Sequence, residues 1–280
     1  MTITSSRSGD DSGPVPAGAT PGRLRLVNAD PRYERAHLID PSPAGFVHVA
    51  VQTAAQRRPG PVLGRDARRE QAVAAMSAYG QAVLGAGEVR EAAVFRAALV
   101  APAPKGHVSS PVQPDVALLV ETATPGDALA LAASAQLREL LGGLRAAGAR
   151  AHVLAARNAR RIADVNHRQG GLFLFNHFFA DDEGVALALW ERLAAWYERE
   201  AGLRNSVLLA PAEGWDSAFA LVNHARFDAS LPRLALHQFA KRSFFSYVRA
   251  NLRANGVAVL PALYRVTWAG MAPSAGSRRA

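Results

Sequence analysis

The amino-acid sequence predicts an α+β protein made of two consecutive β-α-β-β-α-β units whose antiparallel sheets pack face to face. Three observations support this prediction. The order of strand-like and helix-like segments in residues 45–156 returns in residues 171–269. Short stretches match at equivalent places in the two halves. One strand of the second half is apolar on both of its faces, which requires cover on both sides.

In the first half, alternating and β-branched runs indicate strands, and apolar residues at helical spacing indicate helices. The first helix ends at Gly85 and Gly87, and the second is opened by Pro125-Gly126 and closed at Gly148. Strands are expected at residues 46–52, 92–100, 116–121 and 150–156, and helices at residues 66–84 and 127–147.

The second half follows a basic connector at residues 157–171 and repeats the order of elements. Residues 1–22 are rich in Ser, Gly and Pro without apolar periodicity, and are expected to be a disordered tail. Strands are expected at residues 172–178, 206–210, 218–226 and 257–268, and helices at residues 183–200 and 231–254.

Local matches between the halves favour a duplication. Residues 99–103 (LVAPA) correspond to residues 208–212 (LLAPA), each at the end of the same strand of its unit. Residues 117–121 (ALLVE) correspond to residues 219–223 (FALVN). A period of about 105 residues is too long for a solenoid repeat and fits a duplicated small domain.

The composition restricts the function. The chain has 280 residues, 49% of them hydrophobic, a net charge of +9 and no Cys, so disulfides and thiolate-bound metals are excluded. The absence of a long apolar run and of a secretory signal predicts a cytoplasmic protein that does not bind membranes. We assign the Arg excess, which comes with many Ala and Gly residues, to a GC-rich coding sequence rather than to a nucleic-acid partner.

Two strings of the second half are the best site candidates. They are residues 175–181 (FNHFFAD) and 222–228 (VNHARFD), and each joins a strand to the helix-like segment that follows. The first and third strands of such a unit are central, and we expect them to be parallel neighbours, so that the two Asn-His pairs lie close together. Side chains alternate along a strand, so only one residue of each pair can point between the sheets. The sequence leaves open which one it is.

The candidate catalytic roles follow from the side-chain chemistry. Neutral imidazoles suit proton exchange near pH 7, which we assign to His177 and His224. Asn176 and Asn223 would position a carbonyl or enolate, and Arg226 would stabilise developing negative charge. The structural alternative is that these strings cap the following helices through the nearby Asp and Ser side chains.

The first half lacks the Asn-His pairs. Gln52-Thr53 and Glu121-Thr122 stand at the equivalent places. The second half is therefore expected to supply the chemistry, with Glu121 as a further candidate carboxylate.

The topology and repeat of residues 45–269 resemble the dimeric α/β-barrel superfamily, here with both ferredoxin-like halves in one chain. No family-specific catalytic motif is present. The resemblance implies a hydrophobic small molecule bound between the sheets, and its members include cofactor-independent monooxygenases, cyclases and isomerases as well as haem-binding enzymes. We therefore expect an enzyme of secondary metabolism that acts without a cofactor on a hydrophobic or aromatic substrate. The sequence does not decide whether the protein forms a homodimer.

Two alternatives are kept. A haem enzyme would use His237 as the axial ligand, with Arg242 or Arg249 on the propionates. An RNA-binding protein of the RRM type would use the aromatic strands at residues 172–176 and 217–222, although the motif is incomplete. No ligand spacing typical of another metal site is present, and we expect none.

Overall fold

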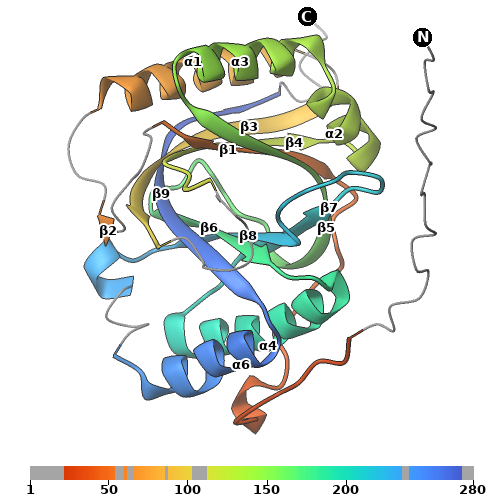
Figure 1. Cartoon of the computed structure of the whole chain (residues 1–280), viewed down its shortest axis with the longest axis vertical. Helices are drawn as coiled ribbons and strands as arrows, with labels where there is room; N and C mark the ends of the chain where they lie inside the picture. The colour runs from red at the N-terminus through yellow and green to blue at the C-terminus, as the bar shows by residue number, and fades with distance from the viewer. Residues whose placement is uncertain are drawn as a thin grey trace, which may run out of the picture.

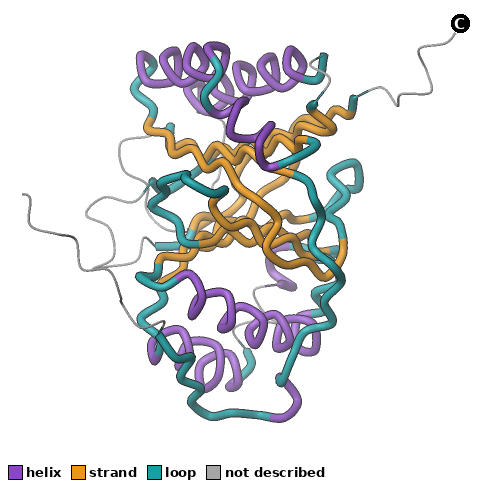
Figure 2. Tube along the Cα trace, turned by 90° about the vertical axis from the view of Figure 1, so that its right-hand side faces the viewer, coloured by secondary structure: helices purple, strands orange, loops and turns teal. Residues whose placement is uncertain are grey.

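The strands of the computed structural model form one antiparallel barrel with helices on two opposite sides (Figure 1). The structure describes residues 22–53, 60–61, 66–85, 88–102, 112–234 and 240–272. Seen from the side, the strands lie between two helical layers (Figure 2).

The first half contains the elements that the sequence predicts, with one helix divided in two. A 3-10 turn, η1 (Pro31–Tyr33), precedes it. Its strands are β1 (Gly45–Gln52), β2 (Gly60–Pro61), β3 (Val89–Val100), β4 (Val116–Thr122) and β5 (Arg150–Ala163), and its helices are α1 (Ala67–Val83), α2 (Pro125–Ala132) and α3 (Ala135–Ala146).

The second half has the same order of strands and helices. Its strands are β6 (Leu172–Phe179), β7 (Ser206–Pro211), β8 (Leu221–Phe227) and β9 (Ala258–Met271), and its helical elements are α4 (Glu183–Ala201), the π-helix η2 (Phe244–Arg249) and α6 (Ala250–Ala254). Apart from the two-residue β2, which the sequence does not predict, both halves thus have the order β-α-β-β-α-β. Their origin by duplication remains a prediction.

The sheet closes on itself. The strand order is β2-β3-β4-β1-β5-β7-β8-β6-β9, and β9 also pairs with β3, so that all strands except β2 form a closed barrel. All the pairings are antiparallel, including β1 with β4 and β6 with β8. The prediction that the first and third strands are parallel is therefore wrong. The helix α1 connects β1 to β3, and these two strands are separated in the sheet by β4. Since β4 pairs antiparallel with both of them, the first strand of the unit (β1) and the third (β4) run in opposite directions.

Alternation along the strands separates an inner core from two outer cores. In β1, Phe46 and Ala50 face the barrel interior, whereas Val47, Val49 and Val51 pack under α1, α2 and α3. The second outer core lies between the other side of the barrel and α4, with Trp190 and Trp196 among its buried residues. This explains why residues 172–178 are apolar on both faces.

Several expected boundaries differ from the structure: β3 begins at Val89 rather than at residue 92, β8 begins at Leu221 rather than at residue 218, and β9 extends to Met271. Three larger differences concern β5 and two helices. β5 continues to Ala163 through residues predicted to be a connector, because Arg157 and Arg160 form ion pairs with Glu183 and Glu191 of α4. The helix predicted at residues 127–147 is interrupted at Ser134, whose side chain accepts a hydrogen bond from Leu137 N and starts α3. The helix predicted at residues 231–254 is helical at residues 231–234, lies outside the described residues at 235–239, and contains the π-helix η2.

Two glycines allow a sharp test of packing. A Cβ atom on Gly45 would lie 2.2 Å from the Thr124 carbonyl oxygen, whereas a Cβ on Gly142 of α3 meets nothing within 4 Å. We expect Gly45→Ala to lower the free energy of unfolding by about 1–3 kcal/mol. Gly142→Ala should raise it by about 0.5–1 kcal/mol through helix propensity. Urea unfolding of the two variants measures both, and equal effects would contradict the packing described.

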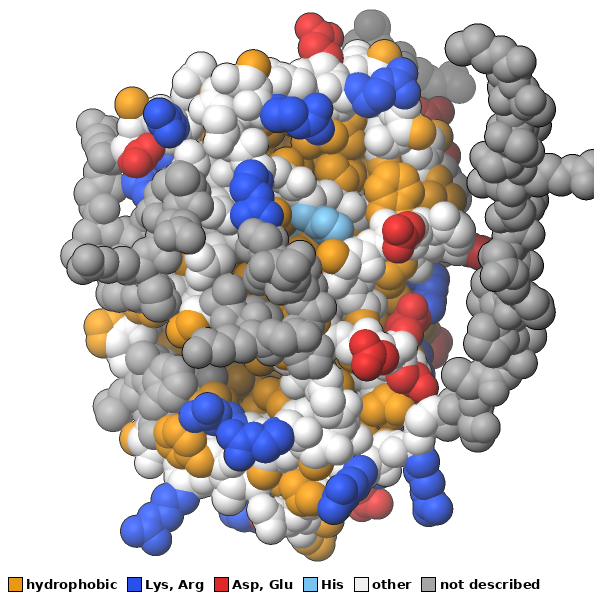
Figure 3. Space-filling view, viewed as in Figure 1, with side chains coloured by type: hydrophobic (Ala, Val, Ile, Leu, Met, Phe, Trp, Pro, Cys, Tyr) orange, Lys and Arg blue, Asp and Glu red, His pale blue; other side chains and the backbone are white. Residues whose placement is uncertain are grey.

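Charged side chains of both signs are present on the face of the molecule that Figure 3 shows. Lys and Arg side chains are spread over the face seen in Figure 3, with Asp and Glu between them, rather than gathered in one patch. Among the described residues, no helix has the length and apolarity that crossing a membrane requires.

Candidate active site

The two Asn-His strings lie on neighbouring strands and pair directly. In the β6–β8 ladder, Asn176 is opposite Asn223 and Phe175 is opposite His224. Opposite residues of an antiparallel pair share a face. Both asparagines therefore lie on one face of the sheet, and both histidines lie on the other, inside the barrel.

The asparagines face the helical layer. Asn223 Oδ1 accepts hydrogen bonds from Trp190 Nε1 at 3.0 Å and from the Ser206 hydroxyl at 2.5 Å. Asn176 Oδ1 is buried and has no partner among the described residues. The predicted role of both asparagines in positioning a substrate between the sheets does not fit this placement. The capping alternative holds for Asp182, which accepts from Val185 N at the start of α4.

His177 forms a pair with His48 of β1. Their Nε2 atoms are 3.1 Å apart, and both residues are fully buried. The Nδ1 atoms of His177 and His48 lie 3.1 Å and 3.3 Å from the carbonyl oxygens of Leu260 and Leu118. Burial lowers the pKa of both imidazoles, to about 4 for His177. Both imidazoles are therefore neutral near pH 7, and the hydrogen bond between them requires a proton on one of the two Nε2 atoms.

His224 forms a second pair with His167, which lies in the loop between β5 and β6. Their Nε2 atoms are 2.9 Å apart, and His167 Nδ1 lies 2.9 Å from Glu91 Oε1. The Leu174 carbonyl oxygen, 3.1 Å from His224 Nδ1, can only accept a hydrogen bond, so Nδ1 carries the proton and Nε2 is the basic nitrogen. His167 thus donates to His224, and one further proton lies between His167 and Glu91.

The Phe175 ring joins the two histidine pairs. It stacks on His224 with centroids 4.1 Å apart and on His48 with centroids 4.7 Å apart. Phe95 packs edge-on against Phe175 and against His224. These rings are fully buried, so aromatic side chains fill the barrel interior around the histidines. A molecule that enters must displace at least one of them.

Two carboxylates, Glu91 and Glu121, lie at the end of the barrel next to His167. Glu91 and Glu121 are opposite each other in the β3–β4 ladder, with side chains 19% and 30% exposed. Burial, followed by the nearby charge of Glu91, raises the pKa of Glu121, and Arg90 at 3.8 Å opposes this only in part. The Glu121 carboxyl is thus close to the relay, but Glu91 makes the contact with His167.

The remaining predicted site residues are placed differently. Arg226 is on the same face of β8 as His224, but its guanidinium donates to the Gly170 carbonyl and to Asp228 at the end of the strand. Its charge is therefore compensated by Asp228. His237, the predicted axial ligand of a haem, lies outside the described residues.

The RNA-binding alternative is wrong for these strands. Phe173 and Phe175, which would stack on bases, are fully buried inside the closed barrel.

Sequence reasoning missed three residues of this constellation. His48 reads as an ordinary strand residue, although its alternation with Phe46 and Ala50 places it on the interior face. His167 belongs to the segment predicted to be a basic connector, and Glu91 precedes the predicted strand. No local signal could pair them, because the partners are 57 to 129 residues apart.

The buried histidines predict a loss of stability in acid. Burial lowers the pKa of His177 from 6.5 to about 4, and those of His48 and His224 well below 6.5. Between the ordinary pKa of 6.5 and the lowered pKa of about 4, His177 binds a proton in the unfolded chain but not in the folded chain. The free energy of unfolding therefore falls as the pH falls through this range. We expect His177 alone to account for about 2 kcal/mol between pH 7 and pH 5.

Urea unfolding at the two pH values measures this loss. The variant His177→Gln should lose about 2 kcal/mol less than the native protein between pH 7 and pH 5. An identical pH dependence in the two proteins would contradict the assignment.

Comparison with known proteins identifies the fold but not the function. No protein-family model matches the chain, and no curated protein does. The crystal structure of an anthrone oxidase-like protein superimposes with a TM-score of 0.56 at 14% identity, over 82% of this chain and 94% of the other. The chain therefore has the dimeric α/β-barrel fold, as the resemblance implied.

Two further structures superimpose less closely. A protein provisionally named a monooxygenase from Lactobacillus acidophilus has a TM-score of 0.45 at 7% identity, over 81% of this chain and 96% of that one. A chlorite dismutase from Candidatus Nitrospira defluvii has a TM-score of 0.40 at 11% identity, over 80% and 91% of the two chains.

The prediction of a protein without a cofactor is contradicted, because the chlorite dismutases among these neighbours are haem proteins. The described residues nevertheless do not fit a haem. Aromatic rings fill the interior, and the Nε2 atoms of His48 and His177 and of His167 and His224 are paired with each other, while His152 Nε2 lies 3.1 Å from Ser217 Oγ. No group of three or more His, Asp or Glu residues suited to a metal is present among the described residues.

Proposed function

We propose that the protein is an enzyme that removes a proton from a hydrophobic aromatic small molecule, as a step of an oxidase- or monooxygenase-type reaction. The observation that carries the proposal is the chain of hydrogen bonds from Glu91 through His167 to His224. It joins a basic nitrogen in an apolar interior to a carboxylate at the barrel end. A neutral imidazole is suited to general base catalysis near pH 7.

The hydrogen bonds define the path of the proton. The Leu174 carbonyl holds the Nδ1 proton of His224 and leaves Nε2 as the base. When a substrate separates His224 from His167, Nε2 takes its O–H or C–H proton, and the electron pair stays on the substrate. While the two rings are apart, His167 and Glu91 together release one proton to water, and the proton that His167 keeps is on Nδ1, which faces Glu91. On renewed contact His224 passes the substrate proton to the free His167 Nε2, which restores the starting arrangement.

The interior supports a flat aromatic substrate. Phe175 already stacks on imidazoles of both pairs, so a planar ring matches the spacing of these side chains. The name of the anthrone oxidase-like neighbour is consistent with a substrate of this class, a polycyclic aromatic ketone with an acidic C–H bond.

Deuterium exchange tests the proton transfer separately from any oxidation. The purified protein is incubated in D2O with anthrone and related aromatic ketones, and exchange at the acidic carbon is followed by NMR. We expect faster exchange than in buffer and a slower rate in Glu91→Gln, with Glu88→Gln as an exposed control. If the native protein accelerates exchange in none of these compounds, the proposal is wrong.

A further inference from the structure

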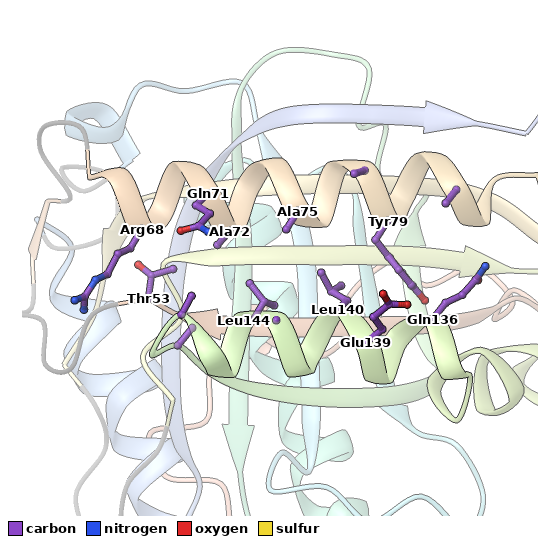
Figure 4. Close-up of a pocket in the computed structure, with 15 residues that line it drawn as sticks. Thr53, Arg68, Gln71, Ala72, Ala75, Tyr79, Gln136, Glu139, Leu140 and Leu144 are labelled. Carbon is purple, nitrogen blue, oxygen red and sulfur yellow. The ribbon is translucent and has the colours of Figure 1, made fainter.

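A groove separates the two helices that cover the first half of the barrel. It has a volume of about 580 Å³ and is lined by facing sides of α1 and α3. Figure 4 shows side chains of the two helices pointing toward each other across it. Its size lies within the range of about 300–1,000 Å³ that is typical of small-molecule sites.

Small side chains create this groove. Its walls contain Ala72, Ala75 and Ala78 of α1 and Gly143 of α3, so the facing helices leave space between them. On the opposite side of the barrel, large rings fill the helical layer, where buried Trp196 packs against Phe244 with centroids 5.8 Å apart. The space is therefore a property of the first half and of its alanines.

A buried hydroxyl lies at one end of the groove. Tyr79 lines the groove, and its hydroxyl oxygen is buried without a hydrogen-bond partner among the described residues. The nearby Ser134 hydroxyl accepts from Leu137 N, and its own proton points to the Tyr79 oxygen only weakly: it lowers the pKa of Tyr79 by less than burial raises it, and it offers no acceptor for the Tyr79 proton. Burial raises the pKa of Tyr79 to about 12, which keeps the phenol a neutral donor. A buried donor without an acceptor is unfavourable, and a bound oxygen atom would relieve it.

A cation lies at the other end. Figure 4 places Arg68 and Thr53 at one end of the groove, and Tyr79 with Gln136 and Glu139 at the other. Arg68 and Tyr79 are eleven positions apart on α1, which corresponds to about 16 Å along a helix. The exposed Glu139 carboxylate disfavours a second anion beside Tyr79.

We propose that this groove binds a medium-chain carboxylic acid with an uncharged oxygen at its far end. The carboxylate pairs with Arg68, the chain lies on the alanines and on Leu140 and Leu144, and the far oxygen accepts a hydrogen bond from Tyr79. An extended chain of about twelve carbons has a length on the order of the helix rise between positions 68 and 79. This site is outside the barrel and independent of the histidine pairs.

Calorimetric titration of the full-length protein with 12-hydroxydodecanoate and dodecanoate tests the site. We expect the hydroxy acid to bind about tenfold more tightly, because only it accepts from Tyr79. Tyr79→Phe should make the two affinities equal by weakening the hydroxy acid alone. Arg68→Gln should weaken both acids severalfold, whereas Arg145→Gln, on α3 outside the groove, should change neither.

Filling the groove provides the decisive comparison. Ala75→Phe and Ala78→Phe place a ring inside it and should abolish binding of both acids. Ala74→Phe, exposed on the same helix but outside the groove, should leave binding unchanged. Circular dichroism confirms that each variant is folded. Absence of saturable binding to the native protein, or binding that survives both groove-filling substitutions, overturns the proposal.

Discussion

His224→Ala is expected to lower the enzyme-dependent rate of substrate deuterium exchange by roughly 10²–10⁴-fold, the contribution of a positioned general base. The substitution removes the only nitrogen that combines a fixed Nδ1 proton, held by Leu174, with a basic Nε2 in contact with His167. The measurement is the initial exchange rate in D2O over a range of substrate concentrations, which separates a change in turnover from a change in binding.

His37→Ala is the matched control, because the His37 side chain is 96% exposed and lies outside the barrel. It should keep the native rate. A His224→Ala protein that stays folded and retains the native rate would remove His224 from the reaction. The pH dependence of the exchange rate is a second measurement, which a purely structural residue would not affect. Glu91→Gln should shift this pH dependence, because Glu91 shares the proton on His167 Nδ1 and releases it to water.

Phe175→Ala is expected to lower the free energy of unfolding by about 3–5 kcal/mol. The ring is fully buried and contacts His48, His224, Phe95 and Tyr264, so its removal leaves a cavity that these side chains cannot close without losing their own contacts. Urea unfolding at pH 7 measures the change.

Phe245→Ala serves as the comparison, because Phe245 is 46% exposed on η2. Its effect should stay within about 0.5 kcal/mol. If Phe175→Ala cost no more than Phe245→Ala, the interior would be loosely packed, and the ring would not be the obstacle that an entering substrate must displace.

The strands could be predicted from the sequence because burial on one or both faces leaves a pattern. Residues 46–52 and 172–178 became β1 and β6 with shifts of a single residue at their ends. The extent of β5 could not be predicted, since Arg157, Arg160 and Arg161 look like a polar loop until Glu183, Glu191 and Asp164 pair with them. The Glu partners of Arg157 and Arg160 are 26 and 31 residues away on α4, outside any local window of sequence.

The candidate site could be predicted only in part, because the partners of its histidines are also distant in the sequence. Repetition of Asn-His drew attention to His177 and His224, and alternation required one residue of each pair to face the interior. The facing partners, His48 and His167, follow from the barrel closure and not from any motif. Asn223 shows the opposite case: its chemistry suggested a substrate contact, but its register places it against Trp190.

The pairing of His48 with His177 has a consequence for symmetry. His48 lies in the first half of the chain and His177 in the second. A barrel assembled from two identical chains would repeat every interior residue about a two-fold axis. With both halves in one chain the interior residues need not repeat: His167 contacts the Glu91 carboxylate, whereas His48 contacts the Leu118 carbonyl, so a proton taken up at His224 leaves toward Glu91.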